Sequence, residues 1–402
     1  LAMAYILFVN PGILGATGMD KCAVLVATCL AAAIGSVFMG MIANLRIALA
    51  PGLGSNAFFS YTVVRQRGYH RQVAMGAVFI SAILFFALSL FKIREWIIHS
   101  IPMALRSAIV AGIGLFLALI ALESAGIVVG NPATLVGIGD ITKPGALLAL
   151  LGFFLIVVLE ARKVTGSVLI GILAITAISM LTGLTPFSGI FSAPPSLAPT
   201  FLKLDIAGAF NVGLVSVIFA FLFVDVFDNT GTLLGVTKRA GLADEQGNVP
   251  KMGRALIADS AAALFGSLLG TSTTTSYVES AAGVSAGGRT GLTAIVVGVL
   301  FLLALFFSPL ASSVPVYATS PALLFVAVLM ASGLADIDWK DITTAAPVTV
   351  TALTMPLTYS IANGIAFGFI TWTLVKLLSG RPHEVNAALV ILSVLCVLKR
   401  WC

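Results

Sequence analysis

The sequence GTSTTTSYVES occupies residues 270–280 of this 402-residue chain. Its polar run, residues 271–275, interrupts an otherwise apolar stretch at 271–287. A second apolar stretch, 47–64, is interrupted in a similar way by Pro51-Gly52-Leu53-Gly54. A broken helix leaves backbone groups unpaired, and a bilayer tolerates such groups only where protein or a water-filled cavity satisfies them. The two stretches therefore predict broken membrane spans around a cavity that can hold a polar solute.

The composition excludes an ordinary soluble protein. Hydrophobic residues make up 59% of the chain, charged residues make up 9%, and the mean hydropathy is +1.10, whereas a soluble domain carries roughly 25% charged residues. The net charge of +6 comes from cations scattered over short loops, which excludes the clustered basic face that nucleic acid requires. The four cysteines and three histidines show no metal-ligand spacing, so we expect no metal, no cofactor and no disulfide scaffold.

Membrane spans of about 20 apolar residues account for most of the chain. We expect eleven continuous spans, the two broken spans and a first helix that ends within residues 1–15, which makes fourteen crossings. With the N-terminus in the cytoplasm, thirteen Lys and Arg residues, Lys376 among them, fall in inside loops and six fall outside, as the positive-inside rule favours for a plasma (inner) membrane protein. Residues 385–398 suit an interfacial or partly inserted tail helix better than a full span. The continuous spans are expected at about 21–43, 70–91, 101–122, 144–161, 164–183, 210–235, 252–270, 290–307, 318–335, 342–359 and 361–378.

An internal repeat orients the two halves of the chain. Leu7-Phe8-Val9-Asn10 recurs as Leu222-Phe223-Val224-Asp225, and the two broken spans fall at matching positions. Because each half holds seven crossings, an odd number, the second half must enter the bilayer from the opposite side. We therefore predict an all-α polytopic membrane protein with fourteen spans in a seven-plus-seven inverted repeat, whose third and tenth spans are broken and contain short extended segments. Paired broken spans of this kind point to the binding site of a secondary transporter.

Four acidic residues are expected at membrane depth: Asp225, Asp228, Asp259 and Glu279. An intramembrane carboxylate is costly and is by default a functional candidate. The three-residue spacing of Asp225 and Asp228 puts both on one helix face. The alternative is that these acids hydrogen-bond neighbouring helix ends and only stabilise the fold, and it weighs more for Asp225 and Asp259 than for the other two.

Three motifs resemble the purine permeases of the AzgA type, a branch of the nucleobase/ascorbate transporter (nucleobase:cation symporter) superfamily. They are residues 50–59 (APGLGSNAFF), 227–232 (FDNTGT) and 270–280. The resemblance covers essentially the whole chain and implies a core domain, holding spans 1 to 4 and 8 to 11, and a gate domain made of the rest. The implied boundaries are 1–91 (core, first half), 92–209 (gate, first half), 210–307 (core, second half), 308–380 (gate, second half) and 381–402 (C-terminal tail helix).

The resemblance also implies a substrate and its site. The ligand would be a purine nucleobase (adenine, guanine or hypoxanthine), imported through alternating access. The family's eighth-span acid falls on Asp228 and its tenth-span acid on Glu279, with the third-span backbone around Asn56 facing them and Phe58 or Phe59 stacking on the ring. The expected substrate-binding residues are Asn56, Ala57, Phe58, Asp228, Thr232, Tyr277, Val278 and Glu279.

Proton symport is the expected energy source, because no phosphate-binding loop for ATP is present in the sequence. Burial raises the pKa of a carboxyl group, so a carboxylate exposed alternately to each side can load a proton outside and release it inside. Glu279 is the first choice of proton carrier, followed by Asp259 and Asp225. The expected partners are therefore a purine nucleobase, a proton and the lipid bilayer, and a homodimer is compatible with this interpretation.

Two other classes of protein compete with this interpretation. Gly137-Ile138-Gly139-Asp140 matches the GxGD string of membrane aspartyl proteases, but Asp140 falls in an expected loop, so we expect no enzyme. The stronger alternative is an anion transporter or channel of the sulfate-permease type, which shares this architecture. Asp228 and Glu279 favour the purine, because they would repel an anion at close range.

Overall fold

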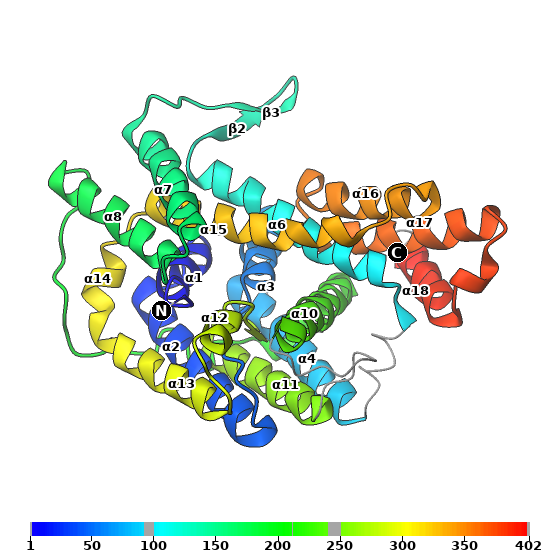
Figure 1. Ribbon diagram of the computed structural model, residues 1–402, viewed down its shortest axis with the longest axis horizontal. Helices are drawn as coiled ribbons and strands as arrows, with labels where there is room; N and C mark the ends of the chain where they lie inside the picture. Colours follow the sequence, from blue (N-terminus) through cyan, green and yellow to red (C-terminus); the bar gives the residue numbers. More distant parts are fainter. Residues whose placement is uncertain (1, 92–99, 211, 240–250, 400–402) are drawn as a thin grey trace.

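The computed structural model describes residues 2–91, 100–210, 212–239 and 251–399, and helices dominate these ranges (Figure 1). Within these ranges, eight helices of at least 18 residues are apolar enough to cross a membrane, and five shorter apolar helices have 10–17 residues. The first half of the chain contributes α1 (Ile6–Gly15), α2 (Lys21–Phe38) with the π-helical η1 (Met39–Ala43), α3 (Leu53–Ala57) with the π-helical η2 (Phe58–Gln66), α4 (Arg71–Leu90), α6 (Met103–Ser124), α7 (Pro144–Ala161) and α8 (Ser167–Leu181).

The second half contributes an equivalent series. The predicted fourteen segments, seven in each half, are therefore confirmed, and the chain is a polytopic integral membrane protein. The helices are α10 (Val212–Arg239), α11 (Met252–Leu269), α12 (Ser280–Ser285), α13 (Leu292–Ala304), α15 (Val316–Ala331), α16 (Ile342–Leu357) and α17 (Ile361–Leu378). Short connecting elements are α9 (Ile206–Ala209), η3 (Leu305–Phe307), α14 (Ser308–Ser312), η4 (Ser332–Asp336) and η5 (Pro382–Glu384), and α18 (Ala387–Lys399) forms the tail.

The two broken spans meet at a short antiparallel strand pair. β1 (Leu49–Pro51) pairs with β4 (Thr274–Ser276), and Ala50 lies opposite Thr275. Each broken span thus contains the short extended segment that the sequence predicts. All six residues of the pair are buried, so strand pairing satisfies backbone groups that the bilayer could not.

A two-fold axis relates the bonds on either side of this pair. The Gly52 N–H donates to the Thr273 carbonyl (2.9 Å), and the Tyr277 N–H donates to the Ala48 carbonyl (3.1 Å). Gly52 and Tyr277 are as far apart in the sequence as Ala48 and Thr273 are, so a rotation about the centre of the strand pair exchanges the two bonds. Any antiparallel strand pair has this local symmetry, and an inverted repeat is compatible with it.

The helices pack in two groups. In one group, α2 packs against α1, α11 and α13, and α4 packs against α10 and α11. In the other, α6 packs against α15 and α16, α7 packs against α8 and α15, and α16 packs against α17. Contacts of α1 with α15, and of α10 with α6 and α17, join the two groups. Each group draws on both halves of the sequence.

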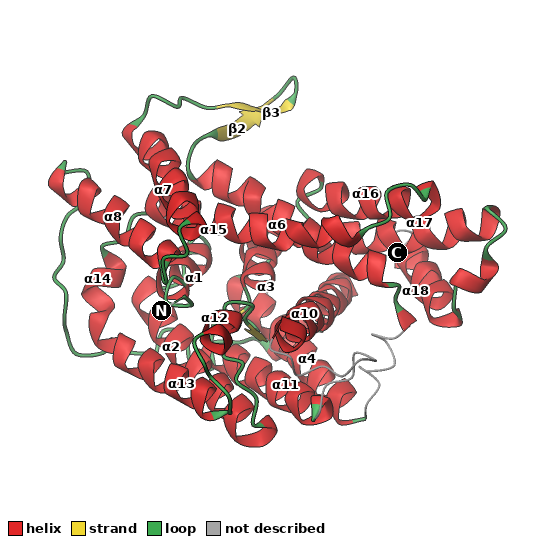
Figure 2. Ribbon diagram, viewed as in Figure 1, coloured by secondary structure: helices red, strands yellow, loops and turns green. Residues whose placement is uncertain are grey.

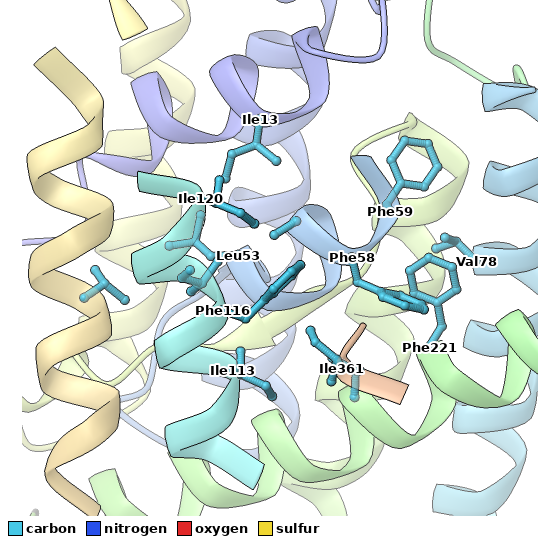
Figure 3. Packing of buried hydrophobic residues seen from close by; sticks show 14 of the residues in the cluster. Ile13, Leu53, Phe58, Phe59, Val78, Ile113, Phe116, Ile120, Phe221 and Ile361 are labelled. Atoms are coloured by element: carbon cyan, nitrogen blue, oxygen red, sulfur yellow. The ribbon is translucent and has the colours of Figure 1, made fainter. Parts of the chain in front are cut away.

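Apolar side chains fill the space between the first broken span and its neighbours. Figure 3 shows Ile113, Phe116 and Ile120 of α6 along the segment that carries Leu53 and Phe58. All five side chains are buried. The broken span is therefore held by packing on its apolar side, while Ser55 and Asn56 on its polar side are held by hydrogen bonds.

A β-hairpin outside the membrane helices was not expected from the sequence. β2 (Val128–Asn131) pairs with β3 (Leu135–Ile138) in the connection between α6 and α7, and the hairpin projects away from the helices in Figure 2. The segment is short and apolar, so its strand signal resembles that of a helix end. Asp140 follows the hairpin in a loop, as predicted.

Lys376 lies fully buried in the last turn of α17 rather than in a loop. Its Nζ is 2.6 Å from Glu384 and 3.3 Å from Asp341, which caps the N-terminus of α16. The hydroxyls of Thr343 and Thr344 donate to the Asp341 carboxylate and hold its pKa well below the usual range. Asp341 therefore stays ionised at neutral pH, and the buried ammonium group keeps a counter-charge.

Candidate functional site

The strand pair brings the expected third-span and tenth-span residues to the same part of the molecule. Residues 56–58 lie at the junction of α3 and η2, just after β1, and residues 277–279 directly follow β4. Across the pair, the Tyr277 hydroxyl donates to the Pro51 carbonyl (2.6 Å). Pro51 has no N–H to donate to a strand ladder, and Gly52 leaves room for Thr275 of the opposite strand, because a Cβ on Gly52 would lie 2.7 Å from a Thr275 methyl carbon.

Asn10 of α1 is a buried hub beside the first broken span. Its amide nitrogen donates to the hydroxyls of Thr28 (2.8 Å) and Thr271 (2.7 Å), and its Oδ1 accepts from the Asn56 amide. The Thr28 hydroxyl already donates to the Val24 carbonyl (2.6 Å), so it must accept from Asn10. This chain of bonds fixes the orientation of both amides.

The fixed orientation leaves one acceptor of Asn56 for a ligand. Asn56 donates through its nitrogen, so its Oδ1 faces elsewhere, and this buried atom accepts no hydrogen bond from the residues that the structure describes. A buried polar atom without a partner costs about 1 to 3 kcal/mol. Such an atom is satisfied when a ligand brings an N–H donor to it.

Asp225 of α10 joins the two broken spans. Its Oδ1 accepts from the Ser55 hydroxyl in the first broken span (2.8 Å) and from the Thr273 hydroxyl in the second (2.7 Å). Asp225 takes the position in the second half that Asn10 takes in the first, as the sequence repeat predicts. Each of these two residues bonds to both broken spans, so both hold the cavity-forming segments together.

Asp259 and Asn229 both bond to Ser276, the last residue of β4 in the second broken span. The Ser276 hydroxyl donates to Asp259 of α11 (3.3 Å), and the Ser276 N–H donates to Asn229 Oδ1 of α10 (2.9 Å). Both side chains are fully buried. The Asn229 amide and the Asp259 carboxylate therefore hold the end of β4 in place.

Glu279 is held differently from the other two acids. It follows β4, precedes α12 and is only partly buried. The Tyr5 hydroxyl, from the residue before α1, donates to Glu279 Oε1 at 2.6 Å. Tyr5 is buried, with 1% of its surface exposed. The bond connects the two halves of the chain directly at the expected site.

The phenylalanines expected to stack on the ligand are both buried. The ring of Phe58 lies edge-on to Phe221 of α10, with centroids 5.0 Å apart, and Phe59 points in a different direction (Figure 3). Edge-to-face pairs of this kind are worth about 0.5 to 1.5 kcal/mol. Stacking on a ligand stays a prediction, and it requires one Phe58 face to remain accessible.

For Thr232 and Val278 the structure gives a position and a degree of burial, and for Asp228 it gives only the helix. Thr232 lies part-buried on α10, one turn beyond the position of Asp228, and Val278 lies part-buried between Tyr277 and Glu279. Asp228 belongs to α10, but its side chain lies outside the described residues. The assignment of Asp228 to the site therefore stays a prediction from the motif.

Tyr5, Asn10 and Asn229 are polar residues of the site that were not among the predicted ones. Asn10 had a detectable signal, because the repeat aligns it with Asp225. Asn229 follows Asp228 within the FDNTGT motif at residues 227–232. Tyr5 had no local signal, because its partner lies 274 residues away.

The site offers hydrogen bonds rather than metal ligands. In the described part of the chain, no group of three or more His, Cys, Asp or Glu side chains could hold a metal ion. Carboxylates, amides and hydroxyls meet instead around two broken spans inside an apolar shell. Such a site can bind a flat, uncharged solute that has both donors and acceptors.

Comparison with known proteins gives matches over the whole chain. The model of a permease family (Xan_ur_permease) matches residues 1–367. The chain is 50% identical over 399 residues to the adenine permease AdeP of Escherichia coli (strain K12), which covers 99% of this chain and 90% of the relative. It is 46% identical over 398 residues to the guanine/hypoxanthine permease PbuG of Bacillus subtilis (strain 168), which covers 96% and 90%.

A solved structure has a similar fold. The transmembrane domain of the cyanobacterial bicarbonate transporter BicA matches with a TM-score of 0.64, over 90% of this chain and 96% of that chain. The two sequences are 15% identical, so this similarity shows the fold alone.

Proposed function

Because the chain belongs to the permease family, we propose that it imports purine nucleobases by proton symport through alternating access. A permease is a transporter rather than an enzyme. The observation that supports a purine substrate is the similarity to two relatives. One is named an adenine permease and the other a guanine/hypoxanthine permease, and each is at least 46% identical over nearly the whole chain.

The chemistry of the site supports an uncharged purine over an anion. Purines present N–H donors, which Glu279, Asp228 and the unpaired Asn56 Oδ1 would accept. An anion would instead meet a carboxylate that Tyr5 holds at the site, and like charges repel at short range. The bicarbonate transporter shares the fold but is distant in sequence, so an anion remains the competing substrate class.

Glu279 is the proposed proton carrier. Asp225 and Asp259 are fully enclosed and bond to hydroxyls of the broken spans, so their proposed role is mainly structural. Glu279 is partly exposed and lies between the two halves of the chain. An acid at such a position can exchange its proton with each side in turn.

The core and gate division is proposed with the boundaries given above. The two packing groups support it, because α1 to α4 pack with α10 to α13, and α6 to α8 pack with α15 to α17. The proposed location is the plasma (inner) membrane with a cytoplasmic N-terminus, which the positive-inside count supports. We also propose that the protein can form a homodimer.

Uptake of radiolabelled solutes tests the function. Cells that lack their own carriers would express the chain and receive adenine, guanine, hypoxanthine, uracil, sulfate or bicarbonate. We expect uptake of at least one purine, no uptake of either anion, and loss of accumulation when a protonophore is added in sodium-free buffer. Uptake of sulfate or bicarbonate without any purine would overturn the proposal, and undiminished accumulation with the protonophore would overturn proton coupling.

A further inference from the structure

Tyr5 makes a hydrogen bond that no motif in the sequence indicates. Its hydroxyl donates to Glu279 Oε1 at 2.6 Å, and its ring is almost completely buried. One oxygen of the Glu279 carboxylate is therefore fixed by a side chain from the first half of the chain.

The place of Tyr5 in the fold gives this bond a wider effect. Tyr5 directly precedes α1, and α1 contacts both α3 of the first broken span and α15 of the other packing group. Glu279 directly follows β4 of the second broken span. The bond therefore connects the acid to the helix that touches both the opposite broken span and the neighbouring group of helices.

We infer that Tyr5 is a positioning residue that sets the rotamer and the protonation of Glu279 during purine transport. The inference rests on the proposed function. A hydroxyl that donates to a carboxylate favours its ionised form. It also removes rotamer freedom that the ligand would otherwise have to restrict. Tyr5 therefore acts on the purine through Glu279 and need not touch it.

Tyr5→Phe tests this role, because it deletes one hydroxyl and keeps the ring that fills the space. We expect the apparent KM for the purine to rise about tenfold, the usual loss for a hydrogen bond to a charged group. The pH profile of uptake should also move to higher pH, because the carboxyl keeps its proton more readily without the donor. Purified Tyr5→Phe protein should retain its wild-type melting temperature within a few degrees.

Tyr317→Phe is the matched control. Its hydroxyl contacts Ser179 and Thr185 on the side of the other group of helices. We expect this variant to keep both the wild-type KM and the wild-type pH profile. A shift of the profile in both variants would mean a general effect of losing a buried hydroxyl, and it would contradict the specific role of Tyr5.

The outcomes separate the two proposals. Wild-type protein that takes up no purine overturns the proposed function. Wild-type uptake together with a Tyr5→Phe variant of unchanged KM and unchanged pH profile overturns the role of Tyr5 alone. If Tyr5→Phe does not reach the membrane, Glu279→Asp withdraws the carboxylate from Tyr5 and is expected to reproduce the change of pH profile; an unchanged profile there also overturns the role.

Discussion

Asp225 and Glu279 are both intramembrane carboxylates, but their surroundings differ. Asp225 is 2% exposed and accepts hydroxyls from both broken spans, whereas Glu279 is partly exposed and bonds to a tyrosine from the other end of the chain. Two hydroxyl donors hold the Asp225 carboxylate in place, as suits a structural role, whereas partial exposure allows Glu279 to exchange a proton. The two acids should therefore respond differently to neutralisation.

Glu279→Gln should abolish purine accumulation without unfolding the protein. The amide keeps the size of the side chain, but it cannot carry a proton and it has one acceptor oxygen where the carboxylate has two. We expect the accumulated purine to fall at least about a hundredfold, on the scale of losing a buried charge-assisted pair, with the same expectation for Asp228→Asn. The exposed Glu160→Gln serves as the control. Normal apparent affinity in both site variants would move the binding site elsewhere.

Asp225→Ala should mainly lower stability. It removes the acceptor of the Ser55 and Thr273 hydroxyls and leaves both buried without that partner, at a cost of about 3 kcal/mol. A fluorescence thermal-shift assay in detergent would measure this as a lower melting temperature. Wild-type stability combined with lost proton coupling would instead make Asp225 a proton carrier.

At the scale of elements, two glycines allow the start of α13 to lie directly against η1, which continues α2. A Cβ on Gly291 would come within 2.2 Å of the Gly40 carbonyl oxygen, and a Cβ on Gly40 would come within 2.5 Å of the Gly291 carbonyl oxygen. The Gly291 N–H donates to Asn44 Oδ1 at the same place (2.9 Å). Backbone atoms cannot rotate away as side chains can, so the contact tolerates no larger residue.

Gly291→Ala should therefore destabilise the protein by about 1 to 3 kcal/mol, the usual cost of overpacking. The measurement is again the melting temperature, with Gly283→Ala as the matched control. A Cβ on Gly283 would meet nothing closer than a Thr293 methyl carbon at 3.6 Å. Equal melting temperatures for Gly291→Ala and the wild-type protein would contradict the close approach.

The sequence predicted the membrane spans correctly but missed the β2–β3 hairpin, and both outcomes have physical reasons. Continuous spans follow from length and hydropathy, and the broken ones follow from Pro51, Gly52 and the threonine run; the assignment to the purine permeases from these motifs is confirmed by the relatives. The β2–β3 hairpin was missed because short apolar runs do not distinguish strand from helix. The bond between Tyr5 and Glu279 could not be predicted, because it depends on how two distant spans cross.

At the scale of the whole molecule, a polar contact joins the two groups of helices near the α16–α17 turn. The Thr62 hydroxyl of η2 donates to the Tyr359 carbonyl (2.6 Å), and the Tyr359 hydroxyl donates to Glu123 at the end of α6. Burial, together with the Glu123 carboxylate, raises the pKa of Tyr359. Tyr359 therefore stays a donor at neutral pH. Under the proposed boundaries, the bond between Thr62 and Tyr359 crosses from core to gate on the outer side.

A disulfide in place of this contact should stop transport. Thr62→Cys with Tyr359→Cys would be oxidised in the membrane, and we expect uptake to fall to background and to return on reduction. Each single variant under the same oxidant is the control. A confirmed crosslink with an unchanged uptake rate would show that core and gate do not separate here, and the proposed division would then need new boundaries.

The most direct measurement of the central claim is purine accumulation by the purified protein in liposomes. Vesicles with an alkaline interior would receive radiolabelled adenine, guanine or hypoxanthine in sodium-free buffer, and a parallel set would contain Glu279→Gln protein. We predict accumulation of at least one purine above its outside concentration while the pH gradient lasts, collapse of that accumulation when a protonophore is added, and none with the variant. Equal purine levels inside and outside at every pH gradient, or equal accumulation by the variant, would contradict the account.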